Sequence, residues 1–327
     1  ESGEIAPERI GVLFGSDLLG IEVEELLGAY QKCIEDGKVN FDKWGGSMSE
    51  IAPLWMLKYL PNMPACHIAI GHDCRGPNNS ITLGQVSGLA AMSEAYRTIE
   101  RGMADIIIAG AASSWIYPYV WARRDSYERS QRTDDPAGAC RPFDAGRDGM
   151  VHAEGAGSLI IESAENAEKR GAKPLARIRS FTQHFKWHNQ NEPPHADAIA
   201  GTISAALELA GMKPEDIGHV NAEGVSTVGD DRAEAQAIRE VLGDVPVTAP
   251  KSYFGNMQAA AGCVEAIASV IGLQKGLVPP TLNYTTPDAE CPVNVVSGEP
   301  LAGTAPTALL LNHCRFGRSA AMIIEKV

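Results

Sequence analysis

Residues 76–88 have the pattern of a short strand, a sharp glycine turn and the start of a helix. At such a turn the first helical residues present unpaired N–H groups, and the helix dipole places partial positive charge there. That environment suits a thiolate nucleophile and the oxyanion it creates. The residue at the turn, Gln85, carries a primary amide instead, which has no lone pair available for acyl transfer. The segment therefore has the surroundings that a nucleophile needs, and Gln85 does not supply one.

Neighbouring residues offer no clear replacement for a nucleophile. Ser87 lies two positions further on, on a different side of the helix turn, and we interpret it as a hydroxyl that supports the helix start. Cys74 precedes the strand and is predicted to be a small buried apolar residue. The run 84–88 is not the G-x-S-x-G elbow of the hydrolases, because its central residue is Val86.

A series of short motifs follows the elbow along the chain. They are the apolar strand 104–110, Arg-Pro-Phe-Asp at 141–144, Arg-Asp-Gly-Met-Val at 147–151, Glu-Gly-Ala-Gly at 154–157, Asn-Ala-Glu-Gly-Val-Ser-Thr at 221–227, Lys-Ser-Tyr-Phe-Gly-Asn at 251–256, Ala-Ala-Gly at 260–262, Pro-Pro-Thr-Leu-Asn at 279–283, and Asn312 with Phe316-Gly317. In composition and order this set resembles the beta-ketoacyl synthases, which are thiolase-fold condensing enzymes. The resemblance extends from about Arg9 to the end of the chain.

The resemblance implies a catalytic triad whose members have all changed. In the family a cysteine takes the acyl group, and two histidines assist decarboxylation of the malonyl carrier and stabilise the enolate. These positions correspond to Gln85, Glu223 and Asn256. Loss of a general acid–base group alone costs ~10²–10⁴-fold in rate. Because Glu223 also brings a negative charge to the place of the malonyl carboxylate, we expect condensation to be lost.

Two further positions match residues that brace the histidines in the family, Lys251 and Glu265. We predict that Lys251 neutralises Glu223 and that Gln85 and Asn256 hydrogen-bond into the same cluster. The alternative is that Lys251 keeps an older structural partner.

The loop 315–318 departs from the flexible Gly-Phe-Gly-Gly gate of the family, because two of its glycines are replaced by Arg315 and Arg318. We expect these arginines to stiffen the loop and to fill space that an acyl chain needs. Phe316 either gates a pocket or is an ordinary core phenylalanine.

Apolar strands alternate with amphipathic helices through most of the chain. We predict strands over 9–14, 105–110, 155–161, 176–181, 217–221, 245–249, 307–314 and 320–325, and helices over 21–36, 53–60, 85–101, 196–210, 230–242 and 260–275. Residues 67–71 are predicted as loop or strand and residues 113–148 as a long loop. Of the predicted strands, 155–161 is expected to be buried. The pattern predicts an α/β protein with halves 1–164 and 165–327. The resemblance to the beta-ketoacyl synthases further implies that the protein has a thiolase-like duplicated αβαβα fold with mixed five-stranded sheets. Because the family's first strand and helices precede the residue that opens this chain, we expect the sequence to be incomplete.

Composition limits the partners. The net charge of −13 argues against nucleic acid or an anionic membrane surface. An acidic acyl carrier protein would need a local basic spot, for which Arg123, Arg124, Arg315 and Arg318 are the candidates.

The seven cysteines include no C-x-x-C pair, so we predict neither a disulfide framework nor a zinc site, and we expect reduced thiols as in the cytoplasm. Three histidines in one loop (His184, His188, His195) lack nearby carboxylates, and we predict no metal or cofactor. We also expect no leader and no membrane span.

Three functions compete for this sequence. The first is a non-catalytic homologue that acts like a chain-length factor, the partner subunit of an active ketosynthase in polyketide or fatty-acid biosynthesis; such factors commonly carry glutamine at the elbow. In this fold the strand before the elbow, here 78–83, pairs with its counterpart across a two-fold axis. The second is an enzyme of altered chemistry, a decarboxylase, hydrolase or acyltransferase that uses Glu223 as base. The third is a homodimeric scaffold.

Overall fold

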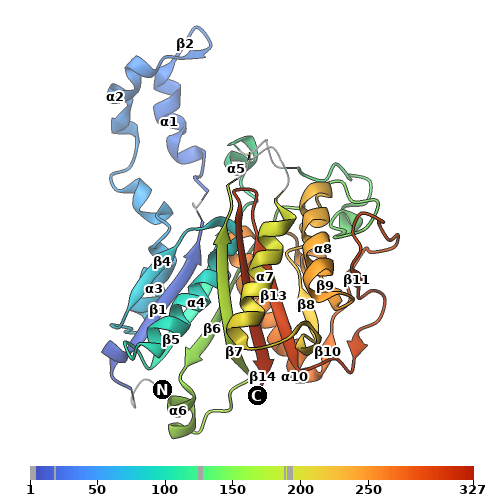
Figure 1. Cartoon of the computed structure of the whole chain (residues 1–327). Coiled ribbons are helices and arrows are strands. Elements are labelled where there is room, and N and C mark those ends of the chain that lie inside the picture. The colour runs from blue at the N-terminus through green and yellow to red at the C-terminus, as the bar shows by residue number, and fades with distance from the viewer. Residues whose placement is uncertain (1–4, 18–19, 124–127, 188, 190–193) are drawn as a thin grey trace.

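Two mixed β-sheets form the body of the protein in a computed structural model that describes residues 5–17, 20–123, 128–187, 189 and 194–327 (Figure 1). The first sheet has the strand order β4-β1-β5-β6. Its strands are β4 (Asn78–Ile81), β1 (Ile10–Ser16), β5 (Ile106–Ser114) and β6 (Glu154–Glu162). The first three are parallel, and β6 pairs antiparallel with β5. Successive side chains of β6 point to opposite faces of the sheet, and α10 packs on this strand, so exposure alternates along it and the prediction that 155–161 are buried is wrong.

The second sheet has the order β11-β9-β8-β13-β14-β7. Its strands are β11 (Asn294–Val295), β9 (Pro246–Thr248), β8 (His219–Asn221), β13 (Thr307–His313), β14 (Arg318–Lys326) and β7 (Ala176–Phe185). Strands β11, β9, β8 and β13 run parallel to one another, whereas β14 runs antiparallel to both of its neighbours. In the described residues the sheets therefore hold four and six strands, not the five each that we expected. The difference in the second sheet arises because the two-residue β11 adds an edge beside β9.

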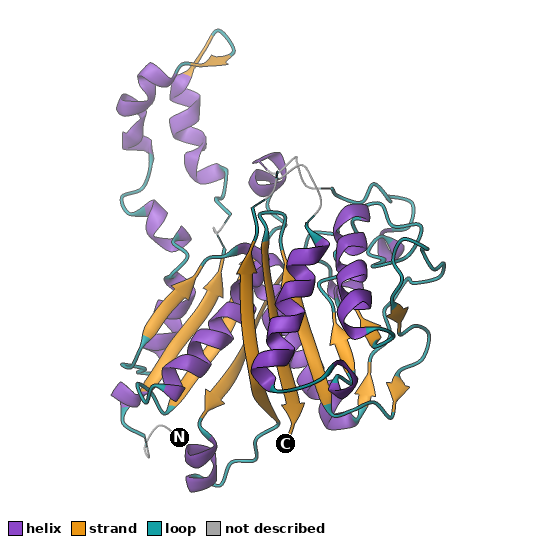
Figure 2. Cartoon of the chain, viewed as in Figure 1, coloured by secondary structure: helices purple, strands orange, loops and turns teal. Residues whose placement is uncertain are grey.

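Helices and sheets alternate in five layers, which confirms the thiolase-like αβαβα prediction (Figure 2). Helices α4 (Ser87–Glu100) and α10 (Ala261–Lys275) lie between the sheets. Helix α3 (Met63–Gly71) covers the outer face of the first sheet, and α7 (Ala196–Ala210) and α8 (Val228–Leu242) cover that of the second. Successive side chains of β13 point to opposite faces of the sheet and pack against the helices on both sides. Leu310 faces α10, whereas Leu309 and Leu311 face α7 and α8.

Helix α3 corrects the prediction of loop or strand for 67–71. The helix has Pro64 in its first turn, and Ala65 and Ile68, three residues apart, pack on Val12 and Phe14 of β1. The remaining elements are short: α1 (Glu24–Cys33), β2 (Ile34–Glu35), β3 (Lys38–Val39), α2 (Trp44–Ser47), α5 (Pro118–Arg123), α6 (Ala164–Lys169), α9 (Lys251–Phe254), β10 (Leu277–Val278) and β12 (Leu301–Ala302). Helix α5 interrupts the long loop predicted over 113–148. No helix in the described part of the chain is long and apolar enough to cross a membrane.

Residues 21–61, here called the arm, leave the layered body (Figure 1). The arm contains α1, the β2–β3 hairpin, α2 and three short 3-10 helices, Phe41–Lys43, Met48–Glu50 and Trp55–Tyr59. It rises from the carboxyl end of β1 and returns to the body at α3, which leads into β4. The helix predicted over 21–36 is therefore shorter, Glu24–Cys33, and belongs to this projection.

Candidate functional site

The predicted elbow is present as a strand, a glycine turn and a helix. Strand β4 leads into Gly84, whose φ of +65° lies in the left-handed region that glycine adopts without steric cost. A single 3-10 turn, Gly84–Val86, then opens into α4. Gln85 stands on this turn with only 4% of its surface exposed. The backbone therefore has the shape of a nucleophile elbow, with an amide at its apex.

Ser87 has the supporting role predicted for it. Its hydroxyl donates to the Gly84 carbonyl at 2.7 Å and accepts from the Leu83 N–H at 2.8 Å. Both bonds stay within the turn, so the oxygen is committed to holding the elbow. Cys74 packs among apolar residues beside β1, and burial raises the pKa of its thiol. Neither residue is placed as an activated nucleophile.

Glu223 and Lys251 form the predicted ion pair in the interior of the protein. Glu223 follows β8 in the loop that leads to α8, and Lys251 is the first residue of α9. The Lys251 Nζ lies 3.3 Å from the Glu223 Oε1 and 2.5 Å from the Glu265 Oε1 of α10. The side chains of Glu223 and Lys251 are completely buried. One ammonium group therefore serves two carboxylates at the centre of the molecule.

Asn312, at the end of β13, closes this cluster from the other side. Its Nδ2 donates to the Glu223 Oε2 at 2.7 Å and to the Glu265 Oε2 at 2.9 Å. The tight packing also involves Gly262, where an added Cβ would lie 2.2 Å from the Asn312 Oδ1. Sequence reasoning included Asn312 in a motif but gave it no role. We call Glu223, Lys251, Glu265 and Asn312 the buried charge cluster.

The protonation of the cluster follows from burial and mutual charge. Burial raises the pKa of Glu223, and that of Glu265 to about 7, because both carboxylates are removed from water; the charge of Lys251 opposes this. Burial alone would lower the pKa of Lys251, but the two carboxylates outweigh it and raise the pKa instead. The charges compensate one another, and no part of the Glu223 surface is open to a substrate.

A second buried pair lies next to the cluster and was not foreseen. The His313 Nε2 is 3.6 Å from the Glu234 Oε2, and Glu234 accepts the backbone N–H groups of Glu223 (2.7 Å) and Gly224 (2.9 Å). Burial alone would lower the pKa of His313, but the negative charge of Glu234 outweighs it and raises the pKa to about 9. This pair therefore fixes the backbone that carries Glu223.

The expectation that Gln85 and Asn256 hydrogen-bond into the cluster is wrong. The Asn256 Oδ1 accepts the Gln258 N–H at 2.9 Å, and its Nδ2 lies 3.8 Å from the Met150 sulfur. The short asparagine side chain is thus satisfied within its own loop. In the described residues Gln85 makes no hydrogen bond to the cluster either; its turn packs against Gln258–Ala260.

The gate loop differs from an ordinary core segment. Phe316 is 43% exposed, so the core-phenylalanine alternative is wrong. The Arg315 side chain is largely buried, with one nitrogen 3.7 Å from Glu128, and the Arg318 guanidinium lies 6.0 Å from the Phe185 ring centroid. The prediction that these arginines stiffen the loop and fill the space of an acyl chain stays a prediction. Of the candidate basic spot, Arg124 and the Arg123 side chain lie outside the described residues.

The arginine and aspartate motifs at 141–151 hold loops together. The Arg147 guanidinium lies 2.6 Å from Asp288 and 3.7 Å from Asp231. Asp144 accepts the backbone N–H groups of Thr285 and Thr286, each at 2.7 Å. These contacts join the first half of the chain to residues 285–288, so the motif residues have a structural role, which is to hold these loops together.

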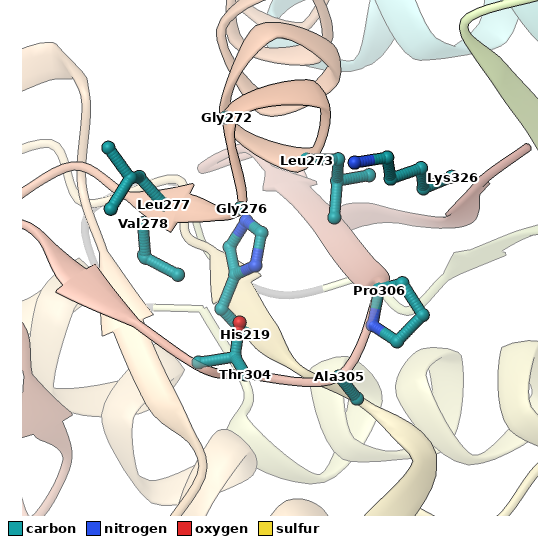
Figure 3. A pocket seen from close by; sticks show the side chains of 10 residues that line it. All are labelled: His219, Gly272, Leu273, Gly276, Leu277, Val278, Thr304, Ala305, Pro306 and Lys326. Carbon is teal, nitrogen blue, oxygen red and sulfur yellow. The ribbon is translucent and has the colours of Figure 1, made fainter.

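His184, which we expected in a loop, lies in β7 and pairs with Ser319 of β14. His184 contacts the Thr202 hydroxyl at 3.1 Å, and His188 lies outside the described residues. No group of three potential metal ligands occurs in the described part of the chain. A pocket of about 110 Å³, lined by His219, Leu273, Lys326 and their neighbours, is shown in Figure 3. It lies at the start of β8 and the end of α10, whereas the buried charge cluster lies at the opposite ends of both elements.

Comparison with known proteins gives the family. The model of the beta-ketoacyl synthase N-terminal domain matches residues 2–167, and that of the C-terminal domain matches residues 175–285. A 3-oxoacyl-[acyl-carrier-protein] synthase 2 from Staphylococcus aureus (strain COL) is 31% identical over 99% of this chain and 76% of the relative. The synthase of the same name from Mycobacterium bovis is 36% identical over 92% of this chain and 71% of the relative.

Solved structures agree with this result. A beta-ketoacyl synthase from Burkholderia phymatum has a TM-score of 0.87 at 30% identity, covering 99% of this chain and 78% of the other. A type II PKS acyl-carrier protein in complex with its ketosynthase gives 0.87 at 27% identity, covering 100% and 80%. The ishigamide ketosynthase/chain length factor shares the fold, with a TM-score of 0.84 at 24% identity over 98% and 76%. The chain thus belongs to the beta-ketoacyl synthase family.

Proposed function

We propose that this chain is a non-catalytic ketosynthase homologue that acts, like a chain-length factor, as partner of an active ketosynthase in fatty-acid or polyketide biosynthesis in the cytoplasm. The proposal rests on the buried charge cluster, in which Lys251 and Asn312 bind Glu223, the residue that the resemblance puts at a position of the family's catalytic histidines. A carboxylate held in this way is occupied by groups of the protein and has no exposed surface for a substrate.

The elbow supports the same conclusion. Acyl transfer needs a nucleophile at the apex of the turn, and the nitrogen lone pair of the Gln85 amide is delocalised into its carbonyl. The only hydroxyl in the turn, that of Ser87, is committed to two hydrogen bonds with the backbone. At the third position, Asn256 has an amide that cannot exchange a proton as an imidazole does. Each of the three chemical roles of the family's triad is therefore without its usual group.

The edge of the first sheet supplies a place for the partner. Strand β4 pairs only with β1 in the described chain, so its other edge is open, and Asn78 and Asn79 are exposed. An open edge is a template for another strand. We propose that residues 78–83 pair antiparallel with the equivalent strand of a ketosynthase subunit. Pairing with a second copy of this chain is the alternative, and an acyl carrier protein is a further candidate partner.

Co-expression with candidate ketosynthases followed by native mass spectrometry tests the proposal. We expect a 1:1 heterodimer that outcompetes self-association of this chain. In hydrogen exchange, residues 78–83 are expected to gain protection when the complex forms. A homodimer that excludes every ketosynthase offered would favour the scaffold function. Release of carbon dioxide from malonyl carrier by this chain alone would favour the altered enzyme, in which Glu223 is the base.

A further inference from the structure

The imidazole of His219 is buried without a hydrogen-bond partner. His219 is the first residue of β8 and is 1% exposed, and within the described residues neither of its ring nitrogens meets a donor or an acceptor. Burial lowers the pKa of this imidazole to about 4, so at neutral pH the ring is uncharged and presents one N–H donor and one acceptor nitrogen. Because nearly all buried polar groups in proteins have a partner, an unpartnered ring calls for an explanation.

The ring of His219 forms part of the wall of the surface pocket in Figure 3. It points from the start of β8 towards the carboxyl end of α10, near Gly276. Apolar side chains form much of the remaining wall: Leu273, Leu277, Val278, Ala305 and Pro306. The volume of the pocket is about 110 Å³. Since an apolar cavity of about 150 Å³ holds benzene, a pocket of this size suits a molecule of about four to six non-hydrogen atoms.

A lysine supplies positive charge at the same pocket. Lys326 is the last residue of β14 and lines the pocket, and its Nζ reaches across to α10, where it donates to the Gln274 carbonyl at 3.1 Å. It makes no ion pair in the part of the chain that the structure describes. An ammonium group has three donors, so two remain for another acceptor.

The donors and acceptors around the pocket do not balance. At the end of α10 the Gly276 N–H donates to the Gly272 and Leu273 carbonyls, and Lys326 takes the next carbonyl. The carbonyl groups of this helix end therefore have their partners. Donors are in excess, because the ammonium of Lys326 and the N–H of His219 both have capacity left. The group that fits such a surplus is an anionic acceptor with two oxygens.

We propose that this pocket binds a small monocarboxylate with a short apolar tail, about the size of butyrate. The carboxylate accepts hydrogen bonds from the Lys326 ammonium and the His219 N–H, and the tail packs on Leu273 and Val278. Small-ligand sites generally combine apolar walls with a few convergent polar groups in this way. The pocket belongs to this chain alone and lies at the ends of β8 and α10 that are remote from the buried charge cluster. The inference therefore does not depend on pairing with a ketosynthase.

Titration of the purified chain with butyrate, followed by NMR of the imidazole nitrogens, tests the site. We expect the ring-nitrogen signals of His219 to shift and to saturate with a Kd of about 1 mM, an ordinary affinity for a ligand of about six non-hydrogen atoms. 1-Butanol has a similar tail and no charge, and should bind about tenfold more weakly. Equal affinity for the two ligands would overturn the assignment of a carboxylate. Absence of a saturable shift at about twenty times the expected Kd would overturn the site.

Two variants and a matched control locate the bound butyrate, whose own signals report binding by saturation transfer. Lys326→Met retains the apolar stem without the ammonium, and should raise the Kd for butyrate about tenfold while leaving that for 1-butanol unchanged. The control Lys38→Met removes a lysine from the β2–β3 hairpin, at the far end of the arm (Figure 1), and should bind butyrate like the wild type. Wild-type affinity in Lys326→Met, or an equal loss in the control, would overturn the proposed contact.

The variant His219→Phe tests the second contact and also identifies the ring, because its nitrogen signals disappear from the spectrum. We expect it to raise the Kd for butyrate about tenfold. Since the native imidazole has no partner to lose, the unfolding midpoint of this variant should not fall. Unchanged affinity in a folded His219→Phe would remove His219 from the site and overturn the proposal.

Discussion

The ammonium of Lys251 lies 3.3 Å from a Glu223 carboxylate oxygen, and neither side chain reaches the solvent. Glu265 approaches the same nitrogen to 2.5 Å. Two buried carboxylates thus depend on one positive charge for their compensation. Four predictions follow from the buried charge cluster, its neighbour His313 and the elbow.

Removing the ammonium should unfold the protein more easily. In Lys251→Met, Glu223 and Glu265 face each other without a counter-charge, and breaking a buried pair in this way costs about 3–5 kcal/mol. Urea denaturation of the purified variant measures this loss. The control Lys169→Met removes an exposed pair with Glu165 and should leave the unfolding midpoint unchanged. Similar midpoints for the two variants would show that the cluster contributes little.

Stability should fall as the pH rises from about 7 towards 9, because of His313. Its pKa is raised to about 9 in the folded protein, from an ordinary value of 6.5, so the folded state binds the proton more tightly. The stabilisation is fully present below pH 6.5 and is lost as the pH passes through 9. Free energies of unfolding at pH 7.0 and 8.5 measure the slope, which His313→Gln should flatten. An equally steep slope in the variant would assign it to other groups.

The close packing around Asn312 leaves no room for a side chain at Gly262. An alanine Cβ there would lie 2.2 Å from the Asn312 Oδ1 and 3.0 Å from the Leu89 side chain, so we expect Gly262→Ala to cost about 1–3 kcal/mol. Gly201, inside α7, is the matched control, because its nearest neighbour would be 4.0 Å from the added Cβ. Gly201→Ala should stabilise the protein by up to about 1 kcal/mol. Thermal denaturation compares the two, and destabilisation by both would contradict the packing argument.

A thiol at the elbow should restore acylation without restoring condensation. In Gln85→Cys the sulfur stands at the start of α4, where the helix dipole favours a thiolate. Intact-mass measurement after incubation with acyl carrier should show an acyl adduct on this variant and none on Gln85→Ala. Because Glu223 and Asn256 remain, we expect no condensation product. Condensation by the single variant would show that the two lost histidines are dispensable here.

The fold could be predicted well where local pattern and tertiary packing agree. Helix α7 has its predicted ends because apolar positions repeat at helical spacing and Gly211, at φ +65°, terminates it. Helix α3 was missed because residues 63–71 are apolar on nearly every side, so periodicity could not separate helix from strand.

The site was predictable in its residue types and less so in its hydrogen bonds. The pairing of Lys251 with Glu223 could be inferred because the resemblance puts both residues at one site, where a buried carboxylate needs a counter-charge. The bridge from Asn312 depends on how close β13 comes to α10, a distance that no local pattern encodes. Asn256 instead found a partner two residues away, at the Gln258 N–H.

The measurement that tests the central claim most directly is the intact mass of the wild-type chain after incubation with acyl and malonyl carriers, with carbon dioxide followed in the same reaction. We predict an unmodified mass and no release above the rate without protein. A thioester or ester on this polypeptide, or release that disappears in Gln85→Ala or Glu223→Gln, would contradict the account.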